Sequence, residues 1–400
     1  MLIYIVNIIS VVLYGLICSL PKDEKNRRIM RLVFLGITFL QLWFIVAFRD
    51  KTGNDFAMYS EGFFLMKRDG FSTLEYKDWE LGFVVLTKLI GAVTANKTVF
   101  FAITALLSLA GPAYLIIKHS KMPFLSVLLY MNLFMYYISF NYVRQAIAIS
   151  VICFSWDFIK KKQFIPFLAV VLFASLFHFS ALIMLPAYFF AKMKGGIRTV
   201  LIYCYLLLLY YITSDSVLNI LLSQVHTEYE NSRFITTGIS VIYIVVPFLL
   251  CAALFFARKY LTAAPPEFGY LVCLSYFAMF WMVVMTKHSL FERFSYYSYI
   301  FIVLAIPEAL VMLKGFLPNF ILQRTRSKMK DSASLQSDED SGAKRINEKS
   351  IRKRASVYYA LALTAVILIT TAYNLFGLMS GTSGVHGVFP YSSVIPFLNG

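Results

Sequence analysis

The chain has 400 residues, of which 59% are hydrophobic and 14% are charged, and its formal net charge is +16. Soluble proteins carry about 25% charged residues, so this composition excludes an ordinary soluble domain. The positive charge does not indicate nucleic acid as a partner, because most of the excess lies in loops beside apolar runs, where the positive-inside rule explains it.

Long apolar runs recur along the whole chain and predict a polytopic integral membrane protein. They are much longer than the ~10 alternating residues of a barrel strand, so we predict an all-α fold. It should have about ten full transmembrane helices plus re-entrant or short half-helices. The first run lacks a basic start and a cleavage site, which favours an anchor helix over a signal peptide. The full spans are predicted at 2–20, 29–48, 98–117, 122–140, 143–159, 197–213, 237–257, 268–287, 294–314 and 356–378.

Two further apolar segments do not fit as simple spans, and a third has the pattern of a helix on the outer surface. Residues 81–95 are short and contain Lys88, which favours a half-helix or a re-entrant piece. Residues 164–191 have basic clusters at both ends, so we predict a hairpin of two short helices whose turn lies near His178. Residues 216–229 have leucines and a valine at helical spacing, which predicts a helix lying on the membrane surface.

The polar content divides the chain into three parts. Residues 1–322 form the predicted transmembrane core. Residues 323–355 are charged and free of aromatics, so they cannot bury a core and are predicted to be a disordered cytoplasmic linker, plain or regulatory. Residues 356–400 hold the last transmembrane helix and a tail, 379–400, that is rich in Gly, Ser and Pro.

The basic residues also predict which loops face the cytoplasm. With the N-terminus outside, 26 of the 37 Lys and Arg fall on the cytoplasmic side, and the outer 11 are matched by 11 Asp and Glu. The opposite orientation would place the 26 outside, so the first is preferred. The cytoplasmic segments are 21–31, 118–121, 160–162, 192–198, 258–267 and 314–355.

With this orientation, the unusual polar residues of the apolar runs collect at the outer leaflet. Arginine near the bilayer is costly, and snorkelling to lipid headgroups is the alternative to a functional role. Snorkelling fits Arg144 less well, because Asn141, Gln145 and Ala148 share its helix face and make that face polar and small. Several arginines at one depth favour an anion as ligand, because the guanidinium gives paired, charge-assisted hydrogen bonds. The collected residues are Arg49, Arg144, His178, His288, Glu292 and Arg293.

The loop "FRDKTGNDFAMYSEGF" at 48–63 adds groups that suit a sugar site. Gly53 allows a sharp turn, and Asp55, Tyr59 and Glu61 offer carboxylates and a stacking ring; a solvated loop is the alternative. His178 is a candidate general base or substrate ligand, or a satisfied buried polar residue. No His, Asp or Glu cluster has metal-ligand spacing, so no metal and no cofactor are expected.

Three motifs resemble those of the EpsG-type, Wzy-like polysaccharide polymerases. "FRDKTGNDFAMY" is similar to an R-x-x-x-G-x-D-x-x-x-Y signature. "YISFNYVRQAIAIS" followed by "KKK" and "LFHFSALIMLPAYFF" resembles a central signature of an RQ pair, a histidine and an L-P pair. "ERFSYYSYIF" resembles a late R-x-x-x-Y-F element. The resemblance covers roughly residues 40–300 and leaves the linker outside.

The resemblance implies a metal-independent membrane glycosyltransferase with a GT-C-like arrangement of helices. It would join undecaprenyl-diphosphate-linked oligosaccharide repeat units at the outer face of the bacterial cytoplasmic (inner) membrane, giving an exopolysaccharide, a capsule or O-antigen. The implied partners are these lipid-linked oligosaccharides, the lipid bilayer and, as an open alternative, a chain-length-regulating co-polymerase. The site residues carried over are Arg49, Gly53, Asp55, Tyr59, Arg144, Gln145, His178 and Arg293.

The chemistry of this reaction agrees with the residues. The leaving group is a lipid diphosphate, so arginines should stabilise its growing charge, and Glu292 is expected among the substrate-binding residues. A base must take a proton from the sugar hydroxyl, and His178 is the first candidate and Asp55 the second. An O-antigen ligase-like transferase and a lipid-linked oligosaccharide transporter or flippase stay open as alternatives.

Overall fold

A computed structural model of the chain describes residues 2–21, 23–76, 79–224, 241–261, 264–333, 348–380 and 385–395. These residues form helices and no β-strand, which confirms the all-α prediction. The longer helices are α1 Leu2–Cys18, α2 Glu24–Ala47, α3 Phe56–Asp69, α4 Leu81–Val93, α5 Lys97–His119, α6 Pro123–Asn132, α8 Val143–Cys153, α10 Phe164–Ser175, α11 Met184–Ala191, α12 Ile197–Gln224, α14 Ile242–Tyr260, α15 Pro266–Val284, α16 Glu292–Tyr299, α17 Ile302–Ala333 and α18 Glu348–Met379.

Seven helices of the described residues are long and apolar enough to cross a membrane, which does not support the predicted number of about ten. The chain is nonetheless polytopic and helical. Among the shorter apolar helices are α1, α4, α6 and α10. The seven long helices are α2, α5, α12, α14, α15, α17 and α18.

Three predicted spans are not single helices, because the helix breaks inside the segment. Residues 122–140 divide into α6 and the short α7 Ile138–Asn141, with Phe134 between them in the left-handed region at φ 66°. Residues 143–159 divide into α8 and α9 Trp156–Lys160, and residues 294–314 divide between α16 and α17. Hydropathy could not reveal the break at Phe134, because the chain is apolar on both sides of it.

The segments 81–95 and 164–191, which did not fit as simple spans, contain short helices, as predicted. Residues 164–191 form α10, the 3-10 turn Phe179–Ile183 and α11, with His178 at the junction. The segment 81–95 holds α4, whose 13 residues are too few to cross a bilayer. The Lys88 side chain is buried there, and its Nζ donates to the backbone carbonyl of Gly70.

The predicted disorder of the linker is wrong at both of its ends. Helix α17 continues to Ala333, and α18 already begins at Glu348, while 334–347 lies outside the described residues. Residues 216–224 are helical and continue α12, the predicted surface position of this helix stays a prediction, and 225–229 lies outside the described residues.

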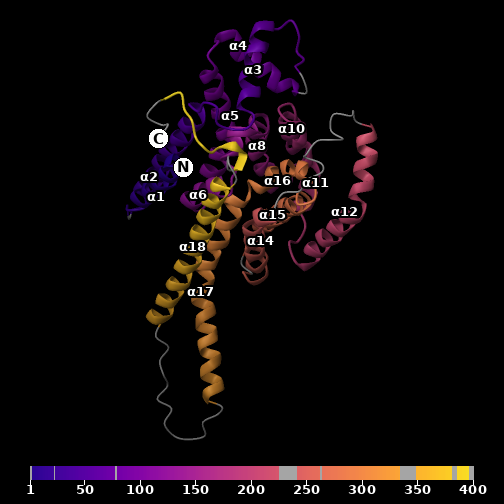
Figure 1. Cartoon of the computed structure of the whole chain (residues 1–400). Coiled ribbons are helices and arrows are strands. Elements are labelled where there is room, and N and C mark those ends of the chain that lie inside the picture. Colours follow the sequence, from indigo (N-terminus) through magenta and orange to yellow (C-terminus); the bar gives the residue numbers. More distant parts are fainter. Residues whose placement is uncertain are drawn as a thin grey trace.

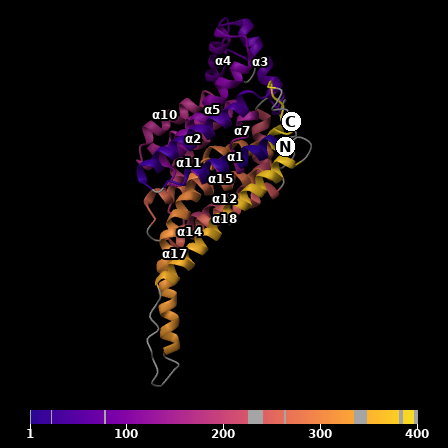
Figure 2. The ribbon, with the colours of Figure 1, turned by 90° about the vertical axis from the view of Figure 1, so that its left-hand side faces the viewer.

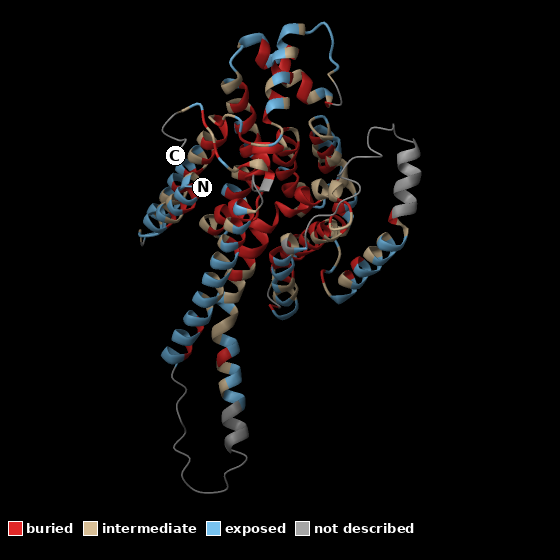
Figure 3. Ribbon diagram, in the orientation of Figure 1, coloured by how far each residue is buried: buried red, intermediate tan, exposed pale blue. Residues whose placement is uncertain are grey.

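The helices pack around a buried centre. Helices α3 and α4 lie at one end, and the paired α17 and α18 extend away at the opposite end (Figures 1 and 2). Buried residues concentrate between these ends, and the outer faces of α12 and α18 are largely exposed (Figure 3). Many of the exposed side chains are large and hydrophobic, as expected of helices that face lipid.

Candidate functional site

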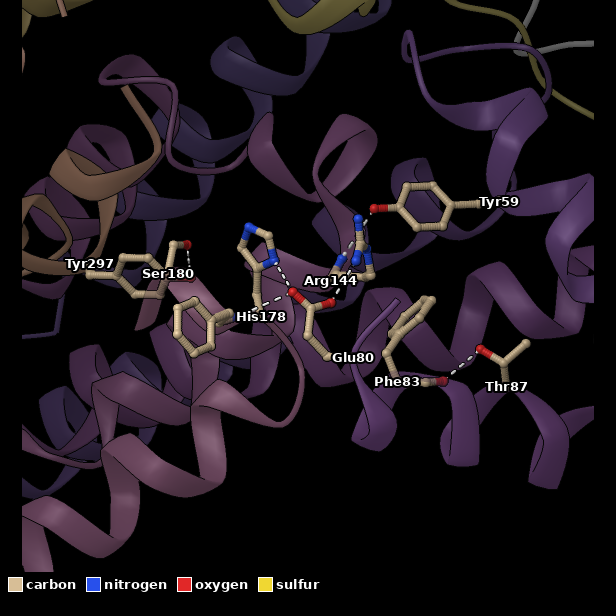
Figure 4. Close-up of polar contacts among 9 residues, drawn as sticks. Tyr59, Glu80, Phe83, Thr87, Arg144, His178, Ser180 and Tyr297 are labelled. Carbon is tan, nitrogen blue, oxygen red and sulfur yellow. Dashed lines mark hydrogen bonds and ion pairs between the residues drawn. The ribbon is translucent and has the colours of Figure 1, made fainter. Parts of the chain in front are cut away.

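The clearest group of interacting charges surrounds Glu80, the residue directly before α4 (Figure 4). One carboxylate oxygen pairs with Nη1 of Arg144 at 2.5 Å, and the other meets Nδ1 of His178 at 2.7 Å. The backbone N–H of Phe179 also donates to that second oxygen, at 3.1 Å. One carboxylate therefore joins an arginine of α8 to the histidine between α10 and α11.

The protonation states of this group follow from its surroundings. Burial acts to raise the pKa of Glu80, but the hydrogen bond and charge of His178 and the charge of Arg144 outweigh burial and lower the pKa to about 2. Burial lowers the pKa of His178, and Glu80 opposes that change. At neutral pH we therefore assign an ionised carboxylate and a neutral imidazole that donates through Nδ1–H. Its unprotonated Nε2 has no hydrogen bond from a described residue and can accept a proton.

A close helix approach places Glu80 beside His178. The N–H of Gly82, in the first turn of α4, donates to the carbonyl of Leu176 at the end of α10, at 2.8 Å. A Cβ on Gly82 would lie 2.8 Å from that same carbonyl oxygen, so only glycine fits without a shift. The pairing also satisfies a free N–H and a free C=O of two helix ends.

A second close approach fixes the helix that carries Arg144. The N–H of Gly111 in α5 donates to Oγ of Ser150 in α8 at 2.7 Å, and a Cβ on Gly111 would lie 1.9 Å from the Ser150 carbonyl oxygen. At the start of α8, the backbone N–H of Arg144 donates to the hydroxyl of Tyr59 at 3.5 Å. The guanidinium of Arg144 also lies over the Trp79 ring, 5.6 Å from its centroid.

Arg293 and Asp55 complete the cluster. The guanidinium of Arg293 lies over the ring of Tyr142 at 5.0 Å, and no described residue hydrogen-bonds to it. Burial raises the pKa of Asp55, and the charges of Arg293 and Arg144 oppose that rise, so both guanidiniums lie within electrostatic reach of this carboxyl. The carboxylate of Asp55 has no hydrogen-bond partner among the described residues, while its backbone N–H donates to Asn141.

The turn that delivers Asp55 requires the glycine of the first motif. Gly53 has φ +98°, and a Cβ there would lie 2.2 Å from the carbonyl oxygen of Phe140. Its N–H donates to the carbonyl of Gly387 at 2.9 Å, so the C-terminal tail supports the same turn. The tail also pairs with this loop where the N–H of Asp50 donates to the Ser392 carbonyl at 2.8 Å.

The structure does not bring Arg49 into this group. Arg49 is 2% exposed, and its guanidinium lies 4.4 Å from the centroid of Phe101 and 5.7 Å from that of Phe140. Nη1 donates to the carbonyl of Val46, whereas Nε and Nη2 have no partner among the described residues. In this position the Arg49 side chain packs the loop, and its predicted substrate contact stays a prediction.

Three further candidate residues lie around the cluster, and their side chains are engaged in packing or hydrogen bonds with other residues. Tyr59 is 2% exposed and packs on Trp79, so it supports Arg144 and offers no open stacking face. Gln145 is buried and donates to the backbone carbonyl of Arg293 at 2.6 Å, which ties α8 to α16. Glu292 points elsewhere, into a neighbouring cavity where the hydroxyl of Tyr296 donates to it.

Sequence reasoning missed Glu80, the residue that organises the cluster. The available signal was its place in "DWELGF", where an acidic residue and Trp79 stand immediately before an apolar helix. That signal does not name the partners, which lie 64 and 98 residues further along the chain. Among the described residues, no group of three or more His, Cys, Asp or Glu is placed to hold a metal ion.

Comparisons with known proteins give one match. The model of the EpsG family matches residues 32–317, which is more than half of the chain and includes Asp55, Glu80, Arg144, His178 and Arg293. No curated protein and no solved structure matches. The chain is a membrane protein of polysaccharide-polymerase type, and it belongs to the EpsG family.

Proposed function

We propose that this protein is a membrane glycosyltransferase that lengthens a polysaccharide by joining undecaprenyl-diphosphate-linked oligosaccharide repeat units. The observation that carries the proposal is a carboxylate-held neutral histidine, His178, within electrostatic reach of a guanidinium, Arg293, that no described residue hydrogen-bonds. A proton acceptor and an anion-binding group in one cluster are what transfer of a sugar from a lipid diphosphate requires. Membership of the EpsG family supports the same reaction type.

In the proposed reaction, a hydroxyl oxygen of the acceptor sugar bonds to the anomeric carbon of the donor sugar. The bond from that carbon to the lipid diphosphate breaks, and the diphosphate keeps the electron pair. Nε2 of His178 takes the hydroxyl proton, and the ionised Glu80 stabilises the imidazolium that forms. Arg293 stabilises the negative charge that grows on the diphosphate. Arg144 is neutralised by Glu80, so its main part is to hold that carboxylate in place.

Asp55 is the second candidate for the base. Its carboxyl has no hydrogen-bond partner among the described residues, and its pKa is raised by burial, so it is a better proton acceptor than an exposed aspartate. His178 is preferred because a carboxylate already orients its ring, whereas nothing described orients the side chain of Asp55. Asp55 is then suited to accept a hydrogen bond from a sugar hydroxyl.

We also propose that the site faces the outer side of the bacterial cytoplasmic membrane. Segments predicted to lie outside contact each other, as in the bonds of Glu80 with His178 and of Gly53 with Gly387. Segments predicted to be cytoplasmic do the same, since Lys118 pairs with Asp157 next to the basic cluster 160–162. The clustering of these contacts supports two distinct faces, and the basic loops favour the cytoplasm for the second.

The product class would be an exopolysaccharide, a capsule or O-antigen, and a chain-length-regulating co-polymerase would be a natural partner. A GT-C-like arrangement of helices also stays a prediction. An O-antigen ligase-like transferase and a transporter of lipid-linked oligosaccharides are the rivals. The ligase would need a different acceptor, and the transporter would break no bond at the anomeric carbon, so the extension assay separates them from a polymerase.

The test is extension of the lipid-linked repeat unit that accumulates in cells deleted for this gene, using full-length protein in detergent or vesicles. Wild-type protein should lengthen this lipid without any other enzyme. His178→Gln should bind the lipid but not extend it, because glutamine cannot accept the proton. His119→Gln, at the C-terminal end of α5 beside Asp157, is the matched control and should extend normally. An unchanged lipid would indicate a transporter, and extension only with a foreign acceptor would indicate a ligase.

A further inference from the structure

A cavity of about 230 Å³ lies beside the cluster and shares Tyr142 with it, since this ring lines the cavity and lies under the Arg293 guanidinium. One face of that ring meets the guanidinium, and the ring of His386 meets it edge-on, with centroids 5.2 Å apart. The cavity therefore lies one aromatic ring away from the proposed diphosphate site. Its walls come from Asn54, Leu133, Phe134, Tyr142, Tyr243, Met282, Met285, Glu292, Ser295, Tyr296, Tyr299, Tyr373, Ser380 and His386.

Two polar groups in the cavity wall have bonding capacity that the protein does not use. The hydroxyl of Tyr299 is buried and has no hydrogen-bond partner among the described residues. Glu292 receives the hydroxyl of Tyr296 on one oxygen, and its other oxygen accepts no bond from a described residue. A buried hydroxyl without a partner is costly, so each such group calls for an explanation. A ligand that donates to Glu292 and also bonds to Tyr299 would satisfy both.

The chemistry of the wall selects the class of ligand. Among the described residues, the wall contains an acidic side chain and no lysine or arginine for a diphosphate, and burying polar groups against a polyprenyl chain would leave them without hydrogen bonds. A sugar ring instead brings hydroxyls for Glu292 and Tyr299 and apolar faces for the tyrosine rings. The volume is below the ~300–1,000 Å³ of pockets for drug-sized ligands, so one ring fits and a whole repeat unit does not.

The C-terminal tail supplies part of this wall. His386 lies in the tail, and its Nε2 is 3.4 Å from the hydroxyl of Tyr296, which in turn bonds to Glu292. The tail is held in place where Gly387 packs against Asn54, since a Cβ on that glycine would lie 2.0 Å from the Asn54 side-chain oxygen. These tail residues lie outside the 32–317 match to the family. The tail therefore contributes His386 to the cavity wall from outside the part of the chain that matches the family.

We infer that this cavity is a sugar-binding subsite that holds one sugar residue of the repeat unit, with Glu292 and Tyr299 as its hydrogen-bonding residues. The inference rests on the proposed function and extends it to substrate selection. The diphosphate would lie at Arg293 on one side of Tyr142, and the bound ring would lie on the other side. The cavity would then decide which sugar is accepted next to the reacting bond.

The experiment uses the oligosaccharide released by mild acid from the accumulated lipid-linked repeat unit, so that no diphosphate contributes to binding. Its affinity for full-length protein is measured by saturation-transfer difference NMR titration. Tyr299→Phe keeps the ring and should weaken binding about three- to tenfold, and Glu292→Gln should weaken it about ten- to a hundredfold. Tyr203→Phe removes another buried hydroxyl without a partner, away from the cavity, and should bind like wild type.

In extension assays, the same two variants should raise KM for the lipid-linked repeat unit while kcat changes little, because Glu80 and His178 are intact. Wild-type affinity in folded Tyr299→Phe and Glu292→Gln proteins would overturn the inference. The proposed function fails separately, when wild-type protein does not extend the lipid. Oligosaccharide binding that depends on Tyr299 would then still establish the subsite.

Discussion

Replacing Glu80 with glutamine tests the core of the proposed mechanism. Both carboxylate oxygens of Glu80 accept hydrogen bonds, one from Arg144 and the other from His178 and the N–H of Phe179. Glutamine keeps the shape but has only one acceptor oxygen, so its NH₂ group must face a donor on one side. The variant therefore releases either the arginine or the histidine.

The structure sets the size of the expected effect. A pKa lowered from 4.5 to about 2 corresponds to about 3 kcal/mol in favour of the ionised Glu80, and at 16% exposure of its side chain solvent screens this little. Because the folded-state pKa is below the unfolded one, this stabilisation is present above about pH 4.5 and is lost as the pH falls towards 2. Glu80→Gln should melt at a lower temperature at neutral pH and should lose stability less steeply in that acidic range.

The kinetic effect should be larger than the effect on stability. A positioned general base contributes about 10²–10⁴ to the rate, and the carboxylate that orients it accounts for much of that factor. We expect kcat for extension to fall within that range with little change in KM. Glu80 opposes the burial that lowers the pKa of His178, so its loss should also move the acidic limb of the kcat profile to lower pH.

The assay is extension of the lipid-linked repeat unit as a function of pH, with thermal melting of the same preparations. Glu75→Gln is the matched control, since this glutamate is exposed in the preceding loop and should behave like wild type. A folded Glu80→Gln protein with wild-type kcat would refute the orientation of His178 by Glu80. Loss of activity with unfolding would leave only a structural role, and the melting data distinguish these outcomes.

Three other perturbations address how the cluster is held. Gly82→Ala should lower kcat at least tenfold by pushing α4 from a carbonyl that its Cβ would meet at 2.8 Å, whereas Gly36→Ala, which meets nothing within 4 Å, should extend normally. Arg49→Met should lower the melting temperature by several degrees through lost packing, but Arg293→Met should melt like wild type and lose substrate binding; the reverse pattern would contradict the assignment. Removing the tail 385–395 should expose the loop it pairs with to protease and abolish extension, and a resistant, active truncation would exclude the tail as a support.

The sequence could place four site residues at one level of the membrane but could not assign their roles. Asp55, Arg144, His178 and Arg293 follow from charge, hydropathy and motif spacing, and the structure brings them together. Arg49 has the same signals and lies apart, enclosed by aromatic rings. Hydropathy indicates the depth of a residue in the membrane, but it does not indicate which way the side chain points.

The sequence by itself determined that the chain is a helical membrane protein, that residues 164–191 form two short helices around His178, and that basic loops alternate with apolar runs. Composition and the spacing of apolar residues are local properties of the sequence, so these features could be predicted without knowing which distant segments are in contact. The tertiary structure alone decided where apolar runs break, as at Phe134, and that Glu80 joins Arg144 to His178. Both depend on contacts between distant segments, and the second requires α4 to approach α10 closely at Gly82, a contact that no local pattern in the sequence records.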